Sequence, residues 1–166
     1  MATNKPAPSF EAKICPPGKL AARLKALKRP LVFTNGVFDI LHRGHVTYLA
    51  QARALGASLL VALNSDASAR TLDKGPGRPV NTLEDRLALV AALEAVTLVT
   101  WFERETPLEL ILAVKPEVLV KGGDWKPEAI VGSTEVKTWG GAVQSIPLLG
   151  GRSTTSVIER IRGKSG

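Results

Sequence analysis

The sequence predicts an α/β fold with one doubly wound, parallel five-stranded sheet in a single domain. From residue 30 onward, short apolar runs rich in branched side chains alternate with segments of helical spacing. Half-exposed strands alternate apolar and polar residues, and these runs do not. Continuous apolar runs are typical of strands covered on both faces. A length of 166 residues fits one domain with a proper core. Together these observations favour strict β/α alternation around one sheet.

The apolar runs place the strands at residues 31–34, 58–64, 96–102, 117–121 and 142–148. Helical spacing predicts helices near 44–55, 82–94, 106–114, 134–139 and 154–162. Parallel strands joined by right-handed crossovers place all their carboxyl ends at one edge of the sheet. Ligands bind at that edge, so polar residues directly after the strands are the candidates for function.

The first 29 residues differ from the rest, and we divide the chain into 1–29, an N-terminal arm and amphipathic helix, and the domain 30–166. Residues 1–18 contain several prolines and predict a loose arm. In "KLAARLKALKR", Leu20, Leu24 and Leu27 form one apolar stripe on a cationic helix. We expect this helix to dock on the domain; a helix lying on a membrane surface is the alternative.

A net charge of +7 is compatible with three kinds of partner: nucleic acid, an anionic membrane or a small polyanionic substrate. Much of the excess lies before residue 30, and no aromatic residues interleave with the cations as in a nucleic-acid platform. The distribution favours the small substrate.

No apolar run reaches the ~20 residues of a membrane span, and the N-terminus has no signal core, so we expect a cytoplasmic protein. Cys15 is the single cysteine, which excludes an internal disulfide and predicts an incidental thiol.

The stretch "TNGVFDILHRGH" contains both histidines of the chain, directly after the first expected strand. Gly36 permits close approach at the strand exit, and Asp39 is an acid nearby. His42 and His45, three residues apart, share one face if a helix begins near residue 42. There they could donate hydrogen bonds to a phosphoryl group that gains charge in a transition state. Two histidines with a structural role are the alternative.

The segment "GVFDILHRGH" resembles the GxFDxxHxGH motif of the HxGH nucleotidyltransferase superfamily, whose members have a Rossmann-like fold. Four further segments extend the resemblance over residues 30–162: "NSDAS", "KGPGRPVNTLEDR", "VKGGDW" and "STTSVI". Together they resemble the adenylyltransferases that make ADP-heptose from ATP and D-glycero-β-D-manno-heptose 1-phosphate for the lipopolysaccharide core. The resemblance is to the stand-alone form rather than to the C-terminal half of a bifunctional kinase/adenylyltransferase.

The polar segments also have interpretations of their own. "NSD" ends a buried strand, with a simple turn as the alternative. "DKGPGRPVN" predicts a movable lid that carries Lys74 and Arg78 to phosphates, or else a structural loop. Thr82 is a candidate helix cap. "RSTTSVIERIR" opens a helix whose hydroxyls and amides form a phosphate-binding N-terminus, or an ordinary cap. Trp125 is a packing residue or a wall of the site.

The resemblance implies further roles. Arg86 organises the nucleotide site, with a surface ion pair to Glu84 or Asp85 as the alternative, and the Ser-Thr-Thr segment holds the β and γ phosphates. The expected catalytic residues are His42, His45 and Lys74. The expected nucleotide-binding residues are Gly36, Val37, Phe38, His42, His45, Arg86, Lys121, Gly122, Gly123, Asp124, Ser153, Thr154 and Thr155. The expected substrate-binding residues are Asn35, Asp39, Asn64, Asp66, Arg78 and Arg152.

The resemblance thus predicts an enzyme that binds ATP and a sugar phosphate. Mg²⁺ enters with ATP and has no direct protein ligand. We expect a homodimer that binds neither nucleic acid nor membrane. Another phosphorylated acceptor, such as glycerol 3-phosphate or phosphopantetheine, used with ATP or CTP, is the first alternative. A tRNA-charging or RNA-binding fragment and a nucleotide sensor without catalysis are others, but no KMSKS-like loop is present and both histidines are retained.

Overall fold

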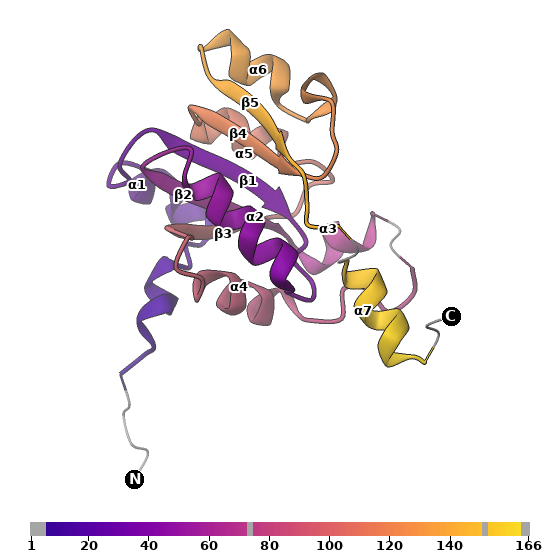
Figure 1. Ribbon diagram of the computed structural model, residues 1–166. Coiled ribbons are helices and arrows are strands. Elements are labelled where there is room, and N and C mark those ends of the chain that lie inside the picture. The colour runs from indigo at the N-terminus through magenta and orange to yellow at the C-terminus, as the bar shows by residue number, and fades with distance from the viewer. Residues whose placement is uncertain (1–5, 73–74, 151–152, 164–166) are drawn as a thin grey trace.

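The computed structural model describes residues 6–72, 75–150 and 153–163. Its centre is a five-stranded sheet in the order β3-β2-β1-β4-β5, in which every paired strand is parallel (Figure 1). The strands are β1 (Leu31–Gly36), β2 (Ser58–Asn64), β3 (Leu98–Phe102), β4 (Val118–Gly122) and β5 (Ala142–Ile146). The predicted doubly wound sheet is confirmed, and each expected strand is found within two residues at either end.

Helices cover both faces of this sheet. The α-helices are α1 (Leu20–Leu24), α2 (Arg43–Arg53), α3 (Asp66–Arg70), α4 (Leu83–Ala91), α5 (Leu108–Val114), α6 (Ser133–Thr138) and α7 (Thr154–Ile161). Short 3₁₀ helices are η1 (Ser9–Lys13), η2 (Pro17–Lys19) and η3 (Pro127–Ala129). The five helices expected after residue 30 are present, and α3 is an additional helix that was not predicted from the sequence.

Side-chain alternation along the strands builds two cores. Val32 of β1 and Leu59 of β2 face α2 and α4, where Leu49 and Val90 are fully buried. Their neighbours along each strand point the other way and pack against α1, α5 and α6. All seven residues of β2 are buried, as expected for a central strand covered on both faces.

The described part of the N-terminal arm is docked rather than loose, which corrects the expectation for residues 6–18. The amide of Cys15 donates to the carbonyl of Val99 on β3 over 2.8 Å, and Ile14 forms an isolated parallel bridge with the same residue. Cys15 is 1% exposed, and Phe10 packs against the core. An edge strand presents unpaired backbone groups, and this segment satisfies some of them on β3.

The amphipathic segment docks on the domain, as expected. Leu20 is buried, while Leu24 and Leu27 pack partly buried against the same core. The helix is shorter than expected because the amides of Ala26 and Leu27 donate three residues back, which tightens the chain into a turn. No helix among residues 6–72, 75–150 and 153–163 is long and apolar enough to cross a membrane.

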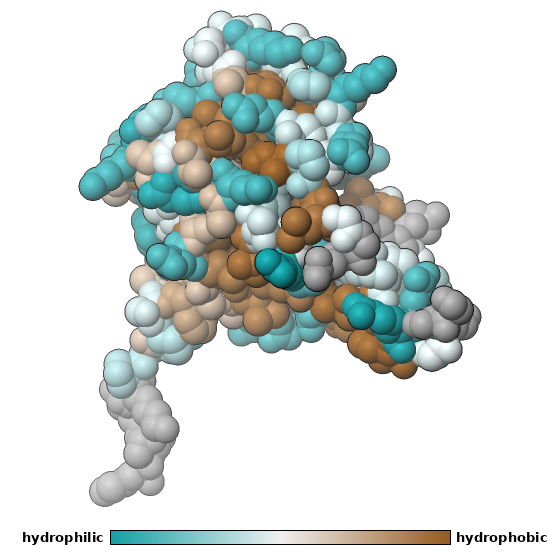
Figure 2. Space-filling model, in the orientation of Figure 1, coloured by the Kyte–Doolittle hydropathy of each residue, from teal (hydrophilic) through white to brown (hydrophobic). Residues whose placement is uncertain are grey.

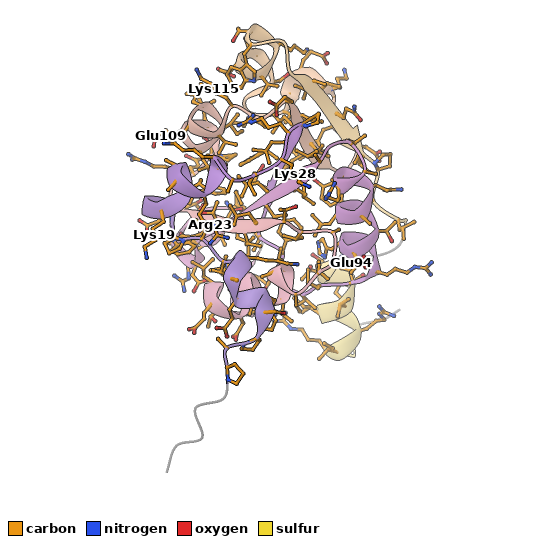
Figure 3. The ribbon with its side chains drawn as sticks, turned by 90° about the vertical axis from the view of Figure 1, so that its left-hand side faces the viewer. Lys19, Arg23, Lys28, Glu94, Glu109 and Lys115 are labelled. Atoms are coloured by element: carbon orange, nitrogen blue, oxygen red, sulfur yellow. The ribbon has the colours of Figure 1, made fainter. Side chains whose placement is uncertain are left out.

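Several cations, from the N-terminal segment and from the loop before β4, lie at the amino ends of the strands. Lys28 shortly precedes β1 and Lys115 precedes β4, and both are labelled in Figure 3 with Lys19 and Arg23. The carboxyl ends of the strands are on the opposite side of the molecule (Figure 1). Much of the positive charge therefore lies away from the edge where a parallel sheet binds ligands.

One close approach makes glycine necessary where α2 leads into β2. A Cβ atom on Gly56 would lie 2.6 Å from the carbonyl oxygen of Pro30 and 2.8 Å from Cγ2 of Val32. We predict that Gly56→Ala lowers the free energy of unfolding by about 1–3 kcal/mol, because the start of β1 must shift. Urea denaturation measures this. Gly18→Ala is the control, since a Cβ atom there meets nothing within 4 Å; equal stability of the two variants would contradict the prediction.

Candidate active site

A cavity of about 780 Å³ opens at the carboxyl ends of the strands. Its walls come from the loops after β1, β2, β3 and β4, from the start of α2 and from the start of α7. α7 lies beside these loops at the edge of the molecule (Figure 1) and carries an apolar outer surface that includes Ile161, which is 76% exposed (Figure 2). The cavity therefore lies where the parallel sheet predicts a ligand site.

Both histidines line this cavity at the start of α2. His42 is the N-cap of the helix, and its Nδ1 accepts a hydrogen bond of 3.1 Å from the amide of Gly44. This bond places the proton of the neutral ring on Nε2. The ring of His45 stacks on that of His42 with centroids 3.9 Å apart. The predicted juxtaposition of the two imidazoles at a helix N-terminus is confirmed.

The loop after β1 packs directly against this pair. Phe38 lies edge-on to His45 with ring centroids 5.4 Å apart, and its backbone adopts a left-handed φ of 50°. A Cβ atom on Gly36 would approach the Phe38 ring to 3.0 Å. Glycine at position 36 therefore leaves room for the aromatic ring that supports His45. A non-glycine residue in this strained region of backbone space is typical of functional loops.

Tyr48 fixes α2 over the gap between β1 and β4. Its hydroxyl lies within hydrogen-bonding distance of the hydroxyl of Thr34 on β1 and donates to the carbonyl of Val120 on β4 over 3.5 Å. Burial raises the pKa of Tyr48 to about 12, although its hydrogen bonds act in the opposite direction. The phenol is therefore neutral at physiological pH. Because Tyr48 follows His45 by one helical turn, this anchor also sets the position of the histidine.

Asp39 is 2% exposed and holds the last four residues of the predicted lid. Its Oδ1 accepts from the amides of Val80 and Asn81 over 2.8 and 2.9 Å, and its Oδ2 accepts from Arg78 over 2.7 Å. Burial acts to raise the pKa of Asp39, but these hydrogen bonds and the charge of Arg78 outweigh it and hold the pKa below its ordinary value. Asp39 is thus an ionised anchor for residues 78–81.

Arg86 lies beneath the cavity with no exposed surface. Its Nη1 donates to the carbonyls of Val37 and Asn64 over 2.7 and 2.9 Å, and its Nε donates to that of Asn81 over 3.2 Å. Its Nη2 pairs with Asp66 at 2.7 Å. Arg86 therefore joins the ends of β1 and β2 to α3 and α4. The surface ion pair with Glu84 or Asp85 is excluded by this burial.

The end of β4 and the loop after it line the cavity through Lys121, Gly122 and Trp125. The indole nitrogen of Trp125 donates to the carbonyl of Gly122 over 3.2 Å, while the ring remains 48% exposed. Gly123 has a φ of 115°, and a Cβ atom there would lie 3.1 Å from that nitrogen. Trp125 is therefore a wall of the site rather than a core residue.

The start of α7 closes the cavity near the histidine loop. Thr154 donates to the carbonyl of Ile40 over 3.3 Å, which ties this helix to the loop after β1. The hydroxyls of Ser153 and Ser156 form a capping box. Ser153, Thr154 and Thr155 all line the cavity. Capping is therefore observed, and it leaves the first turn of α7 facing the site.

The cavity brings together most of the residues predicted from the sequence. Those that line it are Asn35, Gly36, Val37, Phe38, Asp39, His42, His45, Asn64, Arg78, Lys121, Gly122, Ser153, Thr154 and Thr155. Arg86, Asp66, Gly123 and Asp124 lie next to lining residues without forming the wall. Lys74 and Arg152 lie outside the described residues.

Several lining residues were not predicted from the sequence. They belong to the loops after β3 and β4, to the end of α3 and to the segment after β5: Leu72, Glu105, Thr106, Pro107, Ala129, Ile130, Val131 and Leu148. Tyr48 was missed as well, although its spacing of three from His45 was an available signal. The others belong to no motif and reach the cavity only through the tertiary fold.

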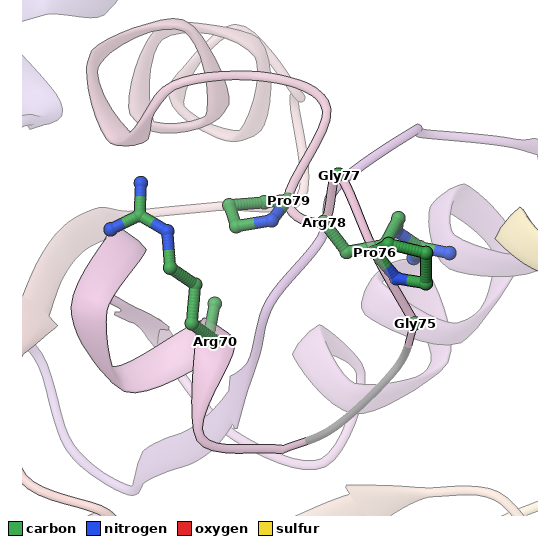
Figure 4. A pocket seen from close by; sticks show the side chains of 7 residues that line it. Arg70, Gly75, Pro76, Gly77, Arg78 and Pro79 are labelled. Carbon is green, nitrogen blue, oxygen red and sulfur yellow. The ribbon is translucent and has the colours of Figure 1, made fainter.

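A second hollow of about 340 Å³ lies between the end of α3 and residues 75–79 (Figure 4). Arg70 extends over it from α3, whereas Arg78 points away from Arg70 (Figure 4) and binds Asp39. Within the described ranges, no three His, Cys, Asp or Glu side chains gather where they could hold a metal ion.

The burial of Arg86 leads to a prediction about stability. Lysine keeps the charge but cannot span four acceptors, so Arg86→Lys leaves buried carbonyls without donors. We predict a loss of about 3 kcal/mol or more in the free energy of unfolding, measured by urea denaturation. Arg104→Lys is the control, because its ion pair with Glu109 is 3.4 Å long and largely exposed. A loss in Arg86→Lys no greater than in this control would show that the clamp contributes little.

Comparisons with known proteins place this geometry in a family. The chain is 53% identical over 155 residues to the D-beta-D-heptose 1-phosphate adenylyltransferase of Bordetella bronchiseptica, covering 92% of this chain and 96% of that protein. It is 52% identical over 143 residues to the bifunctional protein HldE of Trichlorobacter lovleyi and 54% identical over 140 residues to that of Pseudomonas syringae. The chain spans only 29% of the length of each of these two bifunctional relatives.

Solved structures agree with these relatives. The lipopolysaccharide core biosynthesis protein of Thermoplasma volcanium is 31% identical, with a TM-score of 0.59, covering 72% of this chain and 95% of that one. The pantoate-beta-alanine ligase of Francisella tularensis shares the fold alone, with a TM-score of 0.58 at 13% identity over 90% of this chain and 76% of that one. The cytidylyltransferase-like family matches residues 33–161, from β1 to the last residue of α7. With this match across the whole sheet and both histidines in the cavity, the chain belongs to the cytidylyltransferase-like family of nucleotidyltransferases.

Proposed function

We propose that this protein transfers AMP from ATP to D-glycero-β-D-manno-heptose 1-phosphate, giving ADP-heptose and pyrophosphate for the lipopolysaccharide core. The stacked pair of His42 and His45 at the start of α2 supports the reaction class. The 53% identity to the Bordetella bronchiseptica D-beta-D-heptose 1-phosphate adenylyltransferase supports the choice of substrates, since it extends over 92% of the chain.

The proposed reaction is an in-line displacement. An oxygen of the acceptor phosphate attacks the α-phosphorus of ATP, the bond from that phosphorus to the bridging oxygen breaks, and pyrophosphate leaves. The imidazoles of His42 and His45 stabilise the negative charge that builds on the α-phosphoryl group. Position and electrostatics account for the rate, so no protein nucleophile is required.

Other residues have proposed supporting roles. The first turn of α7 holds the β and γ phosphates, and Lys121 and Gly122 lie along the nucleotide. Lys74 and Arg152, outside the described residues, are proposed to contact phosphates. Arg86 organises these loops from beneath. Mg²⁺ is proposed to enter with ATP, where it would neutralise charge on the triphosphate, and Asp39 is already occupied by three donors within the protein.

The surroundings of the enzyme are also part of the proposal. We propose that it acts in the cytoplasm, where ATP and sugar phosphates are available, and that it forms a homodimer. The cations at the amino ends of the strands lie away from the cavity (Figure 3), which favours a small anionic substrate over nucleic acid as the ligand of the site.

A substrate panel tests the proposal directly. We expect pyrophosphate release with ATP and D-glycero-β-D-manno-heptose 1-phosphate, and much slower release with glycerol 3-phosphate or phosphopantetheine. Each acceptor is assayed with ATP and with CTP, because the family description names cytidylyl transfer. Turnover with CTP that equals or exceeds turnover with ATP would overturn the adenylyltransferase assignment and favour the cytidylyltransferase alternative.

The histidines allow a second test. We predict that His42→Ala or His45→Ala lowers kcat roughly a hundredfold or more, because each removes a donor to the transition state. ATP affinity, measured by calorimetry, should change less than about tenfold, since most ground-state phosphate contacts remain. Arg43→Ala is the matched control, as Arg43 lies on the same turn, is exposed and does not line the cavity. Well-folded histidine variants with near-normal kcat would remove the centre of the proposed mechanism.

A further inference from the structure

The proposed nucleotide contacts account for only one half of the cavity. Lys121 and Gly122 are the last two residues of β4, and the start of α7 is bound to the loop after β1. The strand order β3-β2-β1-β4-β5 places β2 and β3 on the other side of β1 and its histidines. The cavity wall continues there through Asn64 and the loop after β3. The proposed nucleotide contacts do not include this half, so it is available to the acceptor.

The loop after β3 offers hydrogen-bonding groups suited to a sugar. Glu105 and Thr106 line the cavity and are both exposed. Within the described parts of the chain, neither side chain forms an ion pair or a hydrogen bond. Asp39, the other carboxylate in the wall, is occupied by three donors. Glu105 is therefore the described cavity carboxylate that can accept hydrogen bonds from sugar hydroxyls.

The backbone around Glu105 is held in place from beneath. The side-chain amide of buried Asn64 donates to Ser68 over 2.9 Å, and the Ser68 hydroxyl donates to the carbonyl of Arg104 over 2.7 Å. The amide of Ser65 donates to the carbonyl of Phe102 over 2.9 Å. These bonds fasten both ends of the Phe102–Arg104 segment to the end of β2 and to α3. Such a fixed backbone reduces the entropy lost when a ligand binds.

We propose that Glu105 and Thr106 form the subsite for the hydroxyl groups of the acceptor, so that this loop selects a polyhydroxylated sugar phosphate. The inference rests on the proposed function and adds to it the residues that recognise the sugar. Glu105 accepts hydrogen bonds from hydroxyls through its carboxylate. Thr106 contributes one hydroxyl beside it, and the relay from Asn64 through Ser68 holds the preceding backbone in place.

Steady-state kinetics of pyrophosphate release tests the subsite with ATP and D-glycero-β-D-manno-heptose 1-phosphate. We expect Glu105→Gln to raise the KM for the sugar phosphate about tenfold or more, because hydrogen bonds to a charged carboxylate are replaced by weaker ones to a neutral amide. Thr106→Val should raise it a fewfold. The KM for ATP should stay within about twofold of the parent value in both variants. Melting temperatures should also match the parent, since both side chains are exposed.

The matched control is Glu109→Gln, because Glu109 is 73% exposed on α5 (Figure 3) and does not line the cavity. It should leave both KM values unchanged. Calorimetry with the sugar phosphate on the ATP-analogue complex should show the same tenfold loss for Glu105→Gln. An active parent whose sugar KM is unaffected by either variant overturns the subsite alone. A loss of ATP affinity equal to the loss of sugar affinity also overturns it, and a parent inactive on the sugar phosphate overturns both the subsite and the proposed function.

Discussion

The site depends on one buried guanidinium. Arg86 reaches the carbonyls that end β1 and β2, the carbonyl of Asn81 before α4, and the carboxylate of Asp66 on α3. A charge without exposed surface is costly unless it is paired and hydrogen-bonded, and here four acceptors meet that need. Removing any of these elements would leave the guanidinium short of partners. Because the buried guanidinium needs all four acceptors, the loops that supply them at the cavity depend on one another.

Around this clamp, other buried side chains hold further parts of the site in place. Tyr48 anchors α2 across β1 and β4, and thereby sets His45 one turn earlier. Asp39 holds residues 78–81, so the end of the predicted lid is fixed to the loop after β1. The relay from Asn64 through Ser68 does the same for the loop after β3. Preorganisation of this kind is what electrostatic catalysis of phosphoryl-type transfer requires.

The amino edge of the sheet serves stability instead. Residues around Cys15 pair with Val99 and cover part of the edge strand β3, and Glu117 binds both Arg29 and the amide of Leu31 where β1 begins. Burial acts to raise the pKa of Glu117, but these hydrogen bonds and the charge of Arg29 hold it below its ordinary value. The N-terminal segment is thus part of the folded unit, although its prolines and charges resemble those of a tail.

The sequence by itself determined the order of strands and helices, because periodicity depends only on which faces of each element are buried. It also located the histidine pair, since both rings lie on one helical turn. The tertiary structure alone decided that Arg86 pairs with Asp66 rather than with its neighbours in sequence, and that Glu105 belongs to the cavity. The physical reason is that these residues are far apart in the sequence, 20 positions in the case of Arg86 and Asp66, and only the packing of parallel strands brings their carboxyl ends to one edge.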